Sequence, residues 1–269
     1  GDGTTTDRYI PTQVAGAWIK ISVGLQHVCG LKTNGTIWCW GVGTNGRLGN
    51  GATSNSLVPV QISSANTYID VSAGGGTSCA VRSSDGKVEC WGRGNTGEMG
   101  NSTVTLDNTT PVVASLATGT YAKVVVGGNF VGALTNSGGA IHCWGGNANG
   151  QLGVGNTTDY WNTLATVSVS SIDKIEAGNS HMCAYKSATM EVLCWGGDTY
   201  GQIGNGVGTT AVTSPFSLGT SQWADVWAGY NHSCGLRTNG TTSCWGNGAN
   251  NQLGDGGAIN QQSPVQINP

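Results

Sequence analysis

Charged residues are scarce in this sequence. Asp, Glu, Lys and Arg make up 9% of its 269 residues, against about a quarter in an average soluble protein. The formal net charge of −3 provides no basic field for nucleic acid phosphates, so nucleic acid binding is not expected. No apolar run approaches the roughly 18 residues that a transmembrane helix requires, so no membrane span is expected either.

Glycine, in contrast, is abundant, with 46 residues, and this favours turns and strands over helices. A Cys-Trp-Gly triplet occurs five times, and its tryptophans are 51, 53, 51 and 50 residues apart. The copies are Cys39-Trp40-Gly41, Cys90-Trp91-Gly92, Cys143-Trp144-Gly145, Cys194-Trp195-Gly196 and Cys244-Trp245-Gly246. A repeat of this length predicts an all-β fold, a β-propeller or solenoid, because one unit cannot bury its own apolar face.

Each repeat contains four short strand-like segments bounded by Gly, Asn, Asp or Ser, so we expect four-stranded blades. The pairs Asn34-Gly35, Asp85-Gly86 and Asn239-Gly240 predict hairpin turns between the second and third strands. Prolines recur in the last strand, which predicts that this strand lies at a blade edge or begins at the proline, because proline lacks a ladder donor. These prolines are Pro11, Pro59, Pro111, Pro215 and Pro264.

The whole chain, residues 1–269, is interpreted as one β-propeller domain. It contains an N-terminal half repeat followed by five full repeats of about 51 residues. The half repeat spans 1–16, and the full repeats span 17–63, 68–113, 121–168, 172–219 and 223–267.

This pattern resembles the regulator of chromosome condensation repeat family, whose units carry Gly-x-x-His-x-x-x-Leu, a Trp-Gly pair and a Gly-Gln-Leu-Gly turn. Matching segments are Gly24 to Leu31, Gly150-Gln151-Leu152-Gly153, Gly201-Gln202-Ile203-Gly204 and Gln252-Leu253-Gly254. The resemblance implies a propeller, usually seven-bladed, that serves as a rigid interaction platform. Members include a nucleotide exchange factor for a small GTPase, a β-lactamase inhibitor and many secreted or surface proteins, so the fold does not decide the function.

Eight of the nine cysteines fall in register as pairs that flank a hairpin turn symmetrically, which would place each pair opposite one another on adjacent strands. The predicted disulfides are Cys29–Cys39, Cys79–Cys90, Cys183–Cys194 and Cys234–Cys244. In the third repeat Gly132 replaces the first cysteine, which leaves Cys143 as a free thiol. Buried free thiols are the alternative for the eight, and a zinc site is excluded because no Cys-x-x-Cys pair or Cys/His quartet is present. Disulfides favour an extracellular location, secreted or at the cell surface.

Six Asn-x-Ser/Thr sequons would be available for glycosylation in a eukaryotic secretory pathway. They begin at Asn34, Asn101, Asn108, Asn156, Asn231 and Asn239. A chain this rich in Asn, Ser and Thr also produces such sequons by chance.

Candidate catalytic groups belong mostly to the repeat. His27, His181 and His232 occupy one repeat position, which indicates framework histidines. His142 precedes Cys143, but neighbours in a strand point to opposite faces, so they cannot form a Cys-His dyad. We therefore expect no catalytic residue, metal site or cofactor. Charged residues at one first-strand position, among them Asp70, Asp225, Lys20, Lys123 and Lys174, indicate a solvated ring with ion pairs between blades.

The segment least like the repeat is Asp159-Tyr160-Trp161-Asn162, an aromatic loop that we interpret as a possible contact surface for a protein partner. The alternative is that this loop packs over a neighbouring blade.

The half repeat leaves the count of segments uneven. Residues 1–14 align with residues 49–62 and 254–267, so the sequence contains six repeat tails but only five repeat heads. Either the chain is a piece of a longer array, or an unpaired strand joins copies head to tail. We expect a non-enzymatic extracellular structural or adhesive protein, possibly a filament subunit. The alternative is a secreted binding or inhibitor module that uses a propeller face.

Overall fold

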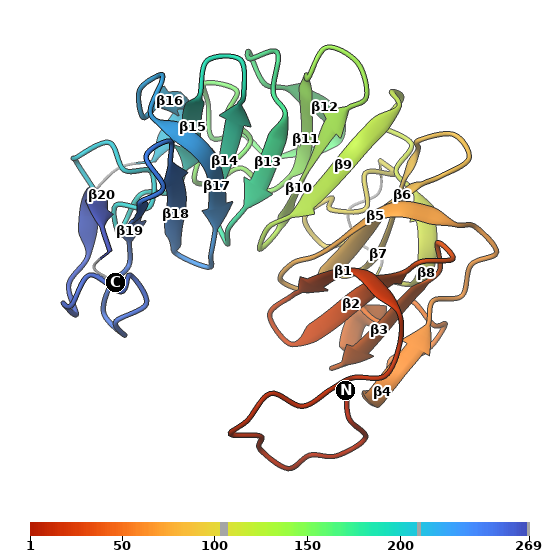
Figure 1. The fold of residues 1–269 in the computed structure, drawn as a ribbon. Coiled ribbons are helices and arrows are strands. Elements are labelled where there is room, and N and C mark those ends of the chain that lie inside the picture. The colour runs from red at the N-terminus through yellow and green to blue at the C-terminus, as the bar shows by residue number, and fades with distance from the viewer. Residues whose placement is uncertain (103–106, 209–210, 268–269) are drawn as a thin grey trace. The chain divides into compact units, whose positions relative to one another are not determined.

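A computed structural model describes residues 1–102, 107–208 and 211–267. In this part of the chain, twenty strands form five four-stranded antiparallel sheets, and the expected all-β fold of repeated blades is confirmed. The strands of each sheet follow one another in chain order, from the first strand at one edge to the fourth at the other (Figure 1). The chain divides into two compact units, which are described separately.

The first unit comprises residues 1–129 with 161–163. Its first sheet consists of β1 (Trp18–Val23), β2 (His27–Lys32), β3 (Ile37–Gly41) and β4 (Ser56–Gln61), with a short 3-10 turn, η1 (Thr44–Gly46), before β4. Its second sheet consists of β5 (Tyr68–Ala73), β6 (Thr77–Arg82), β7 (Val88–Gly92) and β8 (Asn108–Val113). Strand β9 (Tyr121–Val126) also belongs to this unit.

The second unit comprises residues 130–160 and the chain from residue 164 onward. It contains β10 (Phe130–Thr135), β11 (Ile141–Gly145) and most of β12 (Tyr160–Thr166). The fourth sheet consists of β13 (Lys174–Ala177), β14 (His181–Lys186), β15 (Glu191–Gly196) and β16 (Val212–Ser217). The fifth consists of β17 (Trp223–Ala228), β18 (His232–Arg237), β19 (Thr242–Gly246) and β20 (Gln261–Gln266).

The fourth strand of each repeat lies at a sheet edge, where a proline is tolerated, and four of the five carry one. Pro59, Pro111, Pro215 and Pro264 lie in β4, β8, β16 and β20, whereas Pro11 lies in no strand. Between the third and fourth strands the register shifts at every Cys-Trp-Gly triplet, so each triplet tryptophan sits at a bulge.

The triplet tryptophans connect neighbouring repeats, as expected for residues between blades. The indole nitrogen of Trp91 donates to the carbonyl of Arg47 in the preceding repeat (3.1 Å), and Trp245 donates in the same way to Gln202 (2.9 Å). Both side chains are completely buried. Each indole therefore adds a specific hydrogen bond to the apolar area that holds two repeats together.

Four disulfides connect the second and third strands of their sheets, with Cα atoms 4.1 to 4.2 Å apart. They join Cys29 to Cys39, Cys79 to Cys90, Cys183 to Cys194 and Cys234 to Cys244. Cys143 is free and buried, and Gly132 is its partner in the register of β10 and β11. Burial raises the pKa of the Cys143 thiol, so this cysteine is held as an unreactive thiol.

Candidate functional site

His27 and His181 connect neighbouring repeats through buried hydrogen bonds. The Nε2 atom of His27 lies 2.8 Å from Ser78 Oγ, and Ser78 Oγ donates to the carbonyl of Arg47. His181 Nε2 lies 2.9 Å from Ser233 Oγ in the same arrangement. Each serine hydroxyl donates its only proton to a backbone carbonyl. The hydrogen bond between histidine and serine is therefore donated by Nε2, which carries the imidazole proton.

Both imidazoles are therefore neutral framework groups. Burial lowers the pKa of His27 to about 4 and that of His181 to about 3. Their Nδ1 atoms have no hydrogen-bond partner within the described ranges. His232, at the same repeat position in the fifth sheet, is only half-buried and has no side-chain partner in the described part of the chain.

Ion pairs join the first strands of neighbouring sheets. The expectation that the charged residues at this position form a solvent-exposed ring is wrong for Asp70. Lys20 pairs with Asp70, and Lys174 Nζ lies 2.7 Å from Asp225 Oδ1. Asp70 is buried, and its second oxygen accepts the backbone N–H of Val124 at 3.0 Å. This carboxylate is used inside the stack of repeats and not on its surface.

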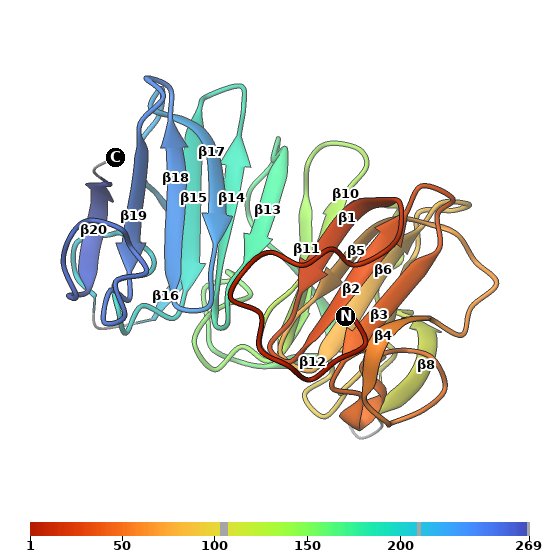
Figure 2. The same ribbon diagram turned by 60° about the horizontal axis from the view of Figure 1, so that its bottom comes forward.

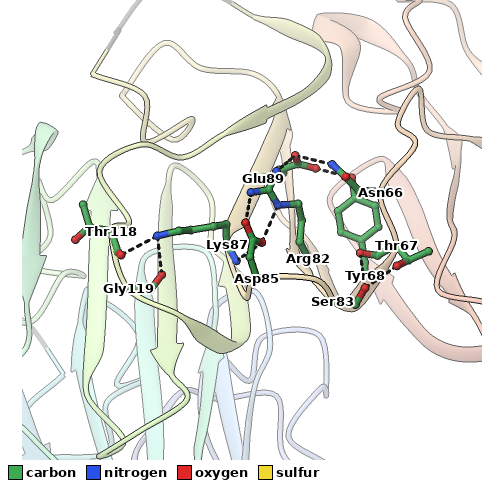
Figure 3. Close-up of polar contacts among 10 residues, drawn as sticks. All are labelled: Asn66, Thr67, Tyr68, Arg82, Ser83, Asp85, Lys87, Glu89, Thr118 and Gly119. Carbon is green, nitrogen blue, oxygen red and sulfur yellow. Dashed lines mark hydrogen bonds and ion pairs between the residues drawn. The ribbon is translucent and has the colours of Figure 1, made fainter.

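A polar network around Glu89 is the largest feature that the sequence analysis missed (Figure 3). The buried Glu89 carboxylate accepts hydrogen bonds from Tyr68 Oη (2.5 Å), Asn66 (3.0 Å) and Arg82 (3.1 Å). Burial and this carboxylate raise the pKa of the Tyr68 hydroxyl. The signal in the sequence is a glutamate between Val88 and Cys90 in a buried strand, where an ionised group requires partners. Since the carboxylate is saturated by neighbours, the network is structural.

The predicted contact segment, residues 159–162, divides into tethered and exposed residues. Asp159 Oδ1 accepts the backbone N–H of Asn147 at 2.6 Å, and Tyr160 Oη accepts from Asn156. The prediction of a loop is wrong for Tyr160, Trp161 and Asn162, which belong to β12, and the last two have exposed side chains. A contact surface here remains a prediction for these two residues.

The sequons differ in accessibility. Asn34 and Asn239 are exposed in hairpin turns, where each Oδ1 accepts the N–H of the threonine two residues later. The Asn231 sequon ends at Ser233, which is fully buried. The Asn101 sequon ends at Thr103, which lies outside the described residues. Asn108 lies on β8, and Asn156 is half-buried. Glycosylation at any of the six remains a prediction.

The first sheet exposes an apolar row that the other repeats bury. Ile21 on β1 is 46% exposed, whereas its four repeat equivalents have no exposed surface. These are Val71, Val124, Ile175 and Val226. Val23 is also exposed, while its equivalents Ala73 and Val126 are buried. Ala177 and Ala228, the remaining equivalents of Val23, are half-buried, so Ile21 is the position of this face that all four other repeats cover.

Residues 1–17, drawn as a ribbon without an arrow in Figures 1 and 2, approach β1 without joining a sheet. Gly1 lies against Trp40 so closely that a Cβ atom would meet the indole nitrogen at 2.7 Å, as Gly49 lies against Trp91. The N–H of Gly3 donates to the carbonyl of Leu57 at 3.0 Å. At the other end, Trp18 Nε1 donates to the carbonyl of Val14 at 3.3 Å.

Between these two anchors the expected last strand of the half repeat does not form. Tyr9 and Ile10 are 95% and 75% exposed. Pro11, which aligns in sequence with Pro59 of β4, lies in no strand. A segment with the sequence of a fourth strand is thus held at both ends but paired with nothing in the described structure. We call residues 1–14 the free tail.

Among the described residues there is no group of three or more His, Cys, Asp or Glu side chains that could hold a metal ion. No helix within those residues is long and apolar enough to cross a membrane. The features that stand out are therefore the exposed row on β1 and the free tail.

Comparison with known proteins identifies the repeat. Two models described as the regulator of chromosome condensation (RCC1) repeat match residues 34–81 and 18–47. The ultraviolet-B receptor UVR8 of Arabidopsis thaliana is 27% identical over 277 residues, which cover 99% of this chain and 62% of the receptor. The chain therefore spans about six tenths of the length of this relative.

Solved structures show the same fold. Human WBSCR16 superposes with a TM-score of 0.81 at 18% identity, covering 96% of this chain and 69% of that protein. Yeast RCC1 (Prp20), in its crystal structure with Kap60, superposes with a TM-score of 0.65 at 21% identity, covering 94% and 75%. With its five copies of the triplet repeat and its four-stranded blades, the chain belongs to the regulator of chromosome condensation repeat family.

Proposed function

We propose that this protein is a non-enzymatic extracellular assembly protein that associates head to tail with further copies of itself. The observation that carries this proposal is the exposed row on β1, since Ile21 has buried equivalents in all four other repeats. Covering this row would remove apolar surface from water, which is the dominant favourable contribution to association.

The four disulfides support a secreted or cell-surface location, because such bonds persist in oxidising compartments. The neutral, buried His27 and His181 and the buried thiol of Cys143 support a role without catalysis. A likeness to yeast RCC1, which was crystallised with Kap60, supports the use of this fold for binding other proteins.

Sedimentation velocity of the full chain over a wide concentration range tests the proposal. Wild-type protein is expected to form larger species reversibly, and Ile21→Asp is expected to weaken association at least about tenfold, because a charge would be buried in the interface. The matched control is Ile69→Asp, since Ile69 is exposed on β5 at a position that is exposed in other repeats too. A wild-type protein that stays monomeric at high concentration would exclude self-assembly.

A secreted protein-binding module is the second candidate, and two exposed aromatic residues favour it, one on β17 and one in the turn between β17 and β18. Trp227 and Tyr230 are both exposed, and Lys174 Nζ lies 4.5 Å from the centre of the Trp227 ring. Exposed aromatic residues near a cation are typical of binding hot spots. A monomeric wild-type protein together with a partner whose binding is lost in Trp227→Ala would support this function instead.

A further inference from the structure

We propose that Asn149 is a site of spontaneous covalent modification, at which the folded protein loses ammonia from the side chain and acquires aspartate or isoaspartate. The site lies in the turn that follows β11 and does not depend on self-assembly. The reaction requires an asparagine followed by glycine, because glycine has no Cβ atom to obstruct the approach of its backbone nitrogen to the asparagine side chain.

The reaction needs water as its only co-reactant. The Gly150 nitrogen gives its proton to hydroxide and attacks Cγ of Asn149, so that a new C–N bond forms. The bond from Cγ to the side-chain nitrogen breaks, and this nitrogen takes a proton from water and leaves as ammonia. Water then opens the cyclic imide at one of its two carbonyls. One opening yields aspartate, and the other yields isoaspartate, in which the backbone runs through the side chain.

Seven Asn-Gly pairs compete for this reaction, and each holds its attacking nitrogen in a hydrogen bond. The pairs begin at Asn34, Asn45, Asn50, Asn149, Asn205, Asn239 and Asn247. Six of the glycine N–H groups donate to a backbone carbonyl at 2.8 to 3.0 Å, and Gly248 donates to Asn260 Oδ1 at 3.2 Å. Each pair therefore reacts only when its turn opens locally. Because all seven share this restraint, the asparagine side chains decide which pair reacts first.

Five of the seven side chains are held by the backbone. Asn34 Oδ1 accepts the N–H of Thr36, two residues later, at 3.1 Å. The other four that accept the N–H two residues later are Asn50, Asn205, Asn239 and Asn247. This bond fixes the side-chain amide in the turn, and rotation of Cγ toward the glycine nitrogen would break it.

Asn45 and Asn149 occupy the same turn position in the first and third repeats, and Asn45 is tied by other side chains. Its Nδ2 donates to Asp107 Oδ2 at 2.6 Å, and its Oδ1 accepts from Arg47 at 3.2 Å. The Asn149 side chain is exposed and has no hydrogen bond within the described ranges. Among the seven, Asn149 can therefore turn toward the next nitrogen without breaking a side-chain bond seen in those ranges.

Modification of Asn149 would act on the contact between the third and fourth repeats. The N–H of Gly150 donates to the carbonyl of Asn147 at 2.8 Å. The next residue, Gln151, accepts the indole N–H of the buried Trp195 on its carbonyl at 3.0 Å. Isoaspartate inserts one carbon atom into the backbone of this turn, so it would displace the carbonyl from the indole.

The first experiment incubates folded wild-type protein at mildly alkaline pH and follows each Asn-Gly pair by peptide mass mapping, with enzymatic methylation of isoaspartate as a second readout. Asn149 is expected to react at least about fivefold faster than any other pair, whereas the seven rates should converge in the reduced, unfolded chain. Asn149→Gln should remove most of the isoaspartate signal, and the matched control Asn34→Gln should keep it. A faster reaction at any other pair, or no reaction at Asn149 in the folded protein, would overturn the proposal.

The second experiment frees the side chain of Asn45 by Asp107→Ala. The rate at Asn45, divided by the rate at Asn34 in the same sample, is expected to rise at least about threefold, because Asn45 loses a side-chain partner. The ratio corrects for general loosening, since Asp107 also accepts the N–H of Gly94. An unchanged ratio would show that side-chain tethering does not select the reacting pair, and would remove the reason for assigning Asn149.

Discussion

His27 and His181 are the residues whose chemistry depends most on their neighbours. Each donates from Nε2 to a serine of the next repeat and leaves Nδ1 without a partner in the described structure. A proton added to Nδ1 would place an unpaired charge in the core, and this is why burial lowers both pKa values. The repeat thus uses histidine as a neutral donor.

This predicts acid sensitivity of the fold. Since the pKa of His27 falls from an ordinary 6.5 to about 4 on folding, the unfolded chain binds the proton first, and stability is lost as the pH falls from about 6.5 to about 4. Each histidine would lower the free energy of unfolding by about 1.4 kcal/mol per pH unit in that window. Guanidinium unfolding at pH 7 and pH 5 measures the loss, and the variant His27→Phe with Ser78→Val should show a shallower slope. Equal slopes would contradict the assignment.

Among the structural elements, the β10–β11 hairpin is the one that departs from its repeat. It keeps Cys143 but has Gly132 in the register position where the other repeats carry the first cysteine. The neighbouring strands have the geometry of the disulfide-bonded hairpins, so the hairpin forms without the bond.

Gly132→Cys is therefore expected to form a fifth disulfide with Cys143. In the chain-entropy account, closing this short loop would add about 2 to 3 kcal/mol to the free energy of unfolding. Thiol titration of the unfolded protein should find no free cysteine, against one in the wild type, and the thermal midpoint should rise. Gly132→Ser serves as the control for the added side chain. A second free thiol in place of the bond would show that the strands do not approach closely enough.

At the scale of the whole molecule, the disulfides compensate for the scarcity of charged residues that could form ion pairs. With 9% charged residues, stability depends on the buried tryptophans, the buried polar links between repeats and four covalent bonds. The same scarcity of charge leaves the exposed face of β1 without the charged residues that usually prevent edge-to-edge association.

Reduction is therefore expected to destabilise the protein strongly. Loss of four bonds that each contribute about 2 to 3 kcal/mol would lower the thermal midpoint by at least about 10 °C. Thermal unfolding followed by circular dichroism, with and without a thiol reductant, measures the change. Cys143→Ser should respond to the reductant as the wild type does, because that thiol is already free. A midpoint that does not respond to reductant would remove the argument for an oxidising compartment.

The sequence by itself determined the repeat, the four strands of each blade, the prolines at the sheet edges and the register that brings Cys29 opposite Cys39. These features follow from the periodicity of each segment and from the residues of its turns. Both depend only on a strand and the strand next to it in the hairpin. It also located the surplus tail, because alignment of repeats requires no structure. Only the tertiary structure decided that Ile21 is exposed while Val71 is buried, and that Asp70 lies inside the stack. Equivalent positions carry similar residues, so their burial and partners depend on whether a neighbouring repeat covers them, which is a property of the assembled fold.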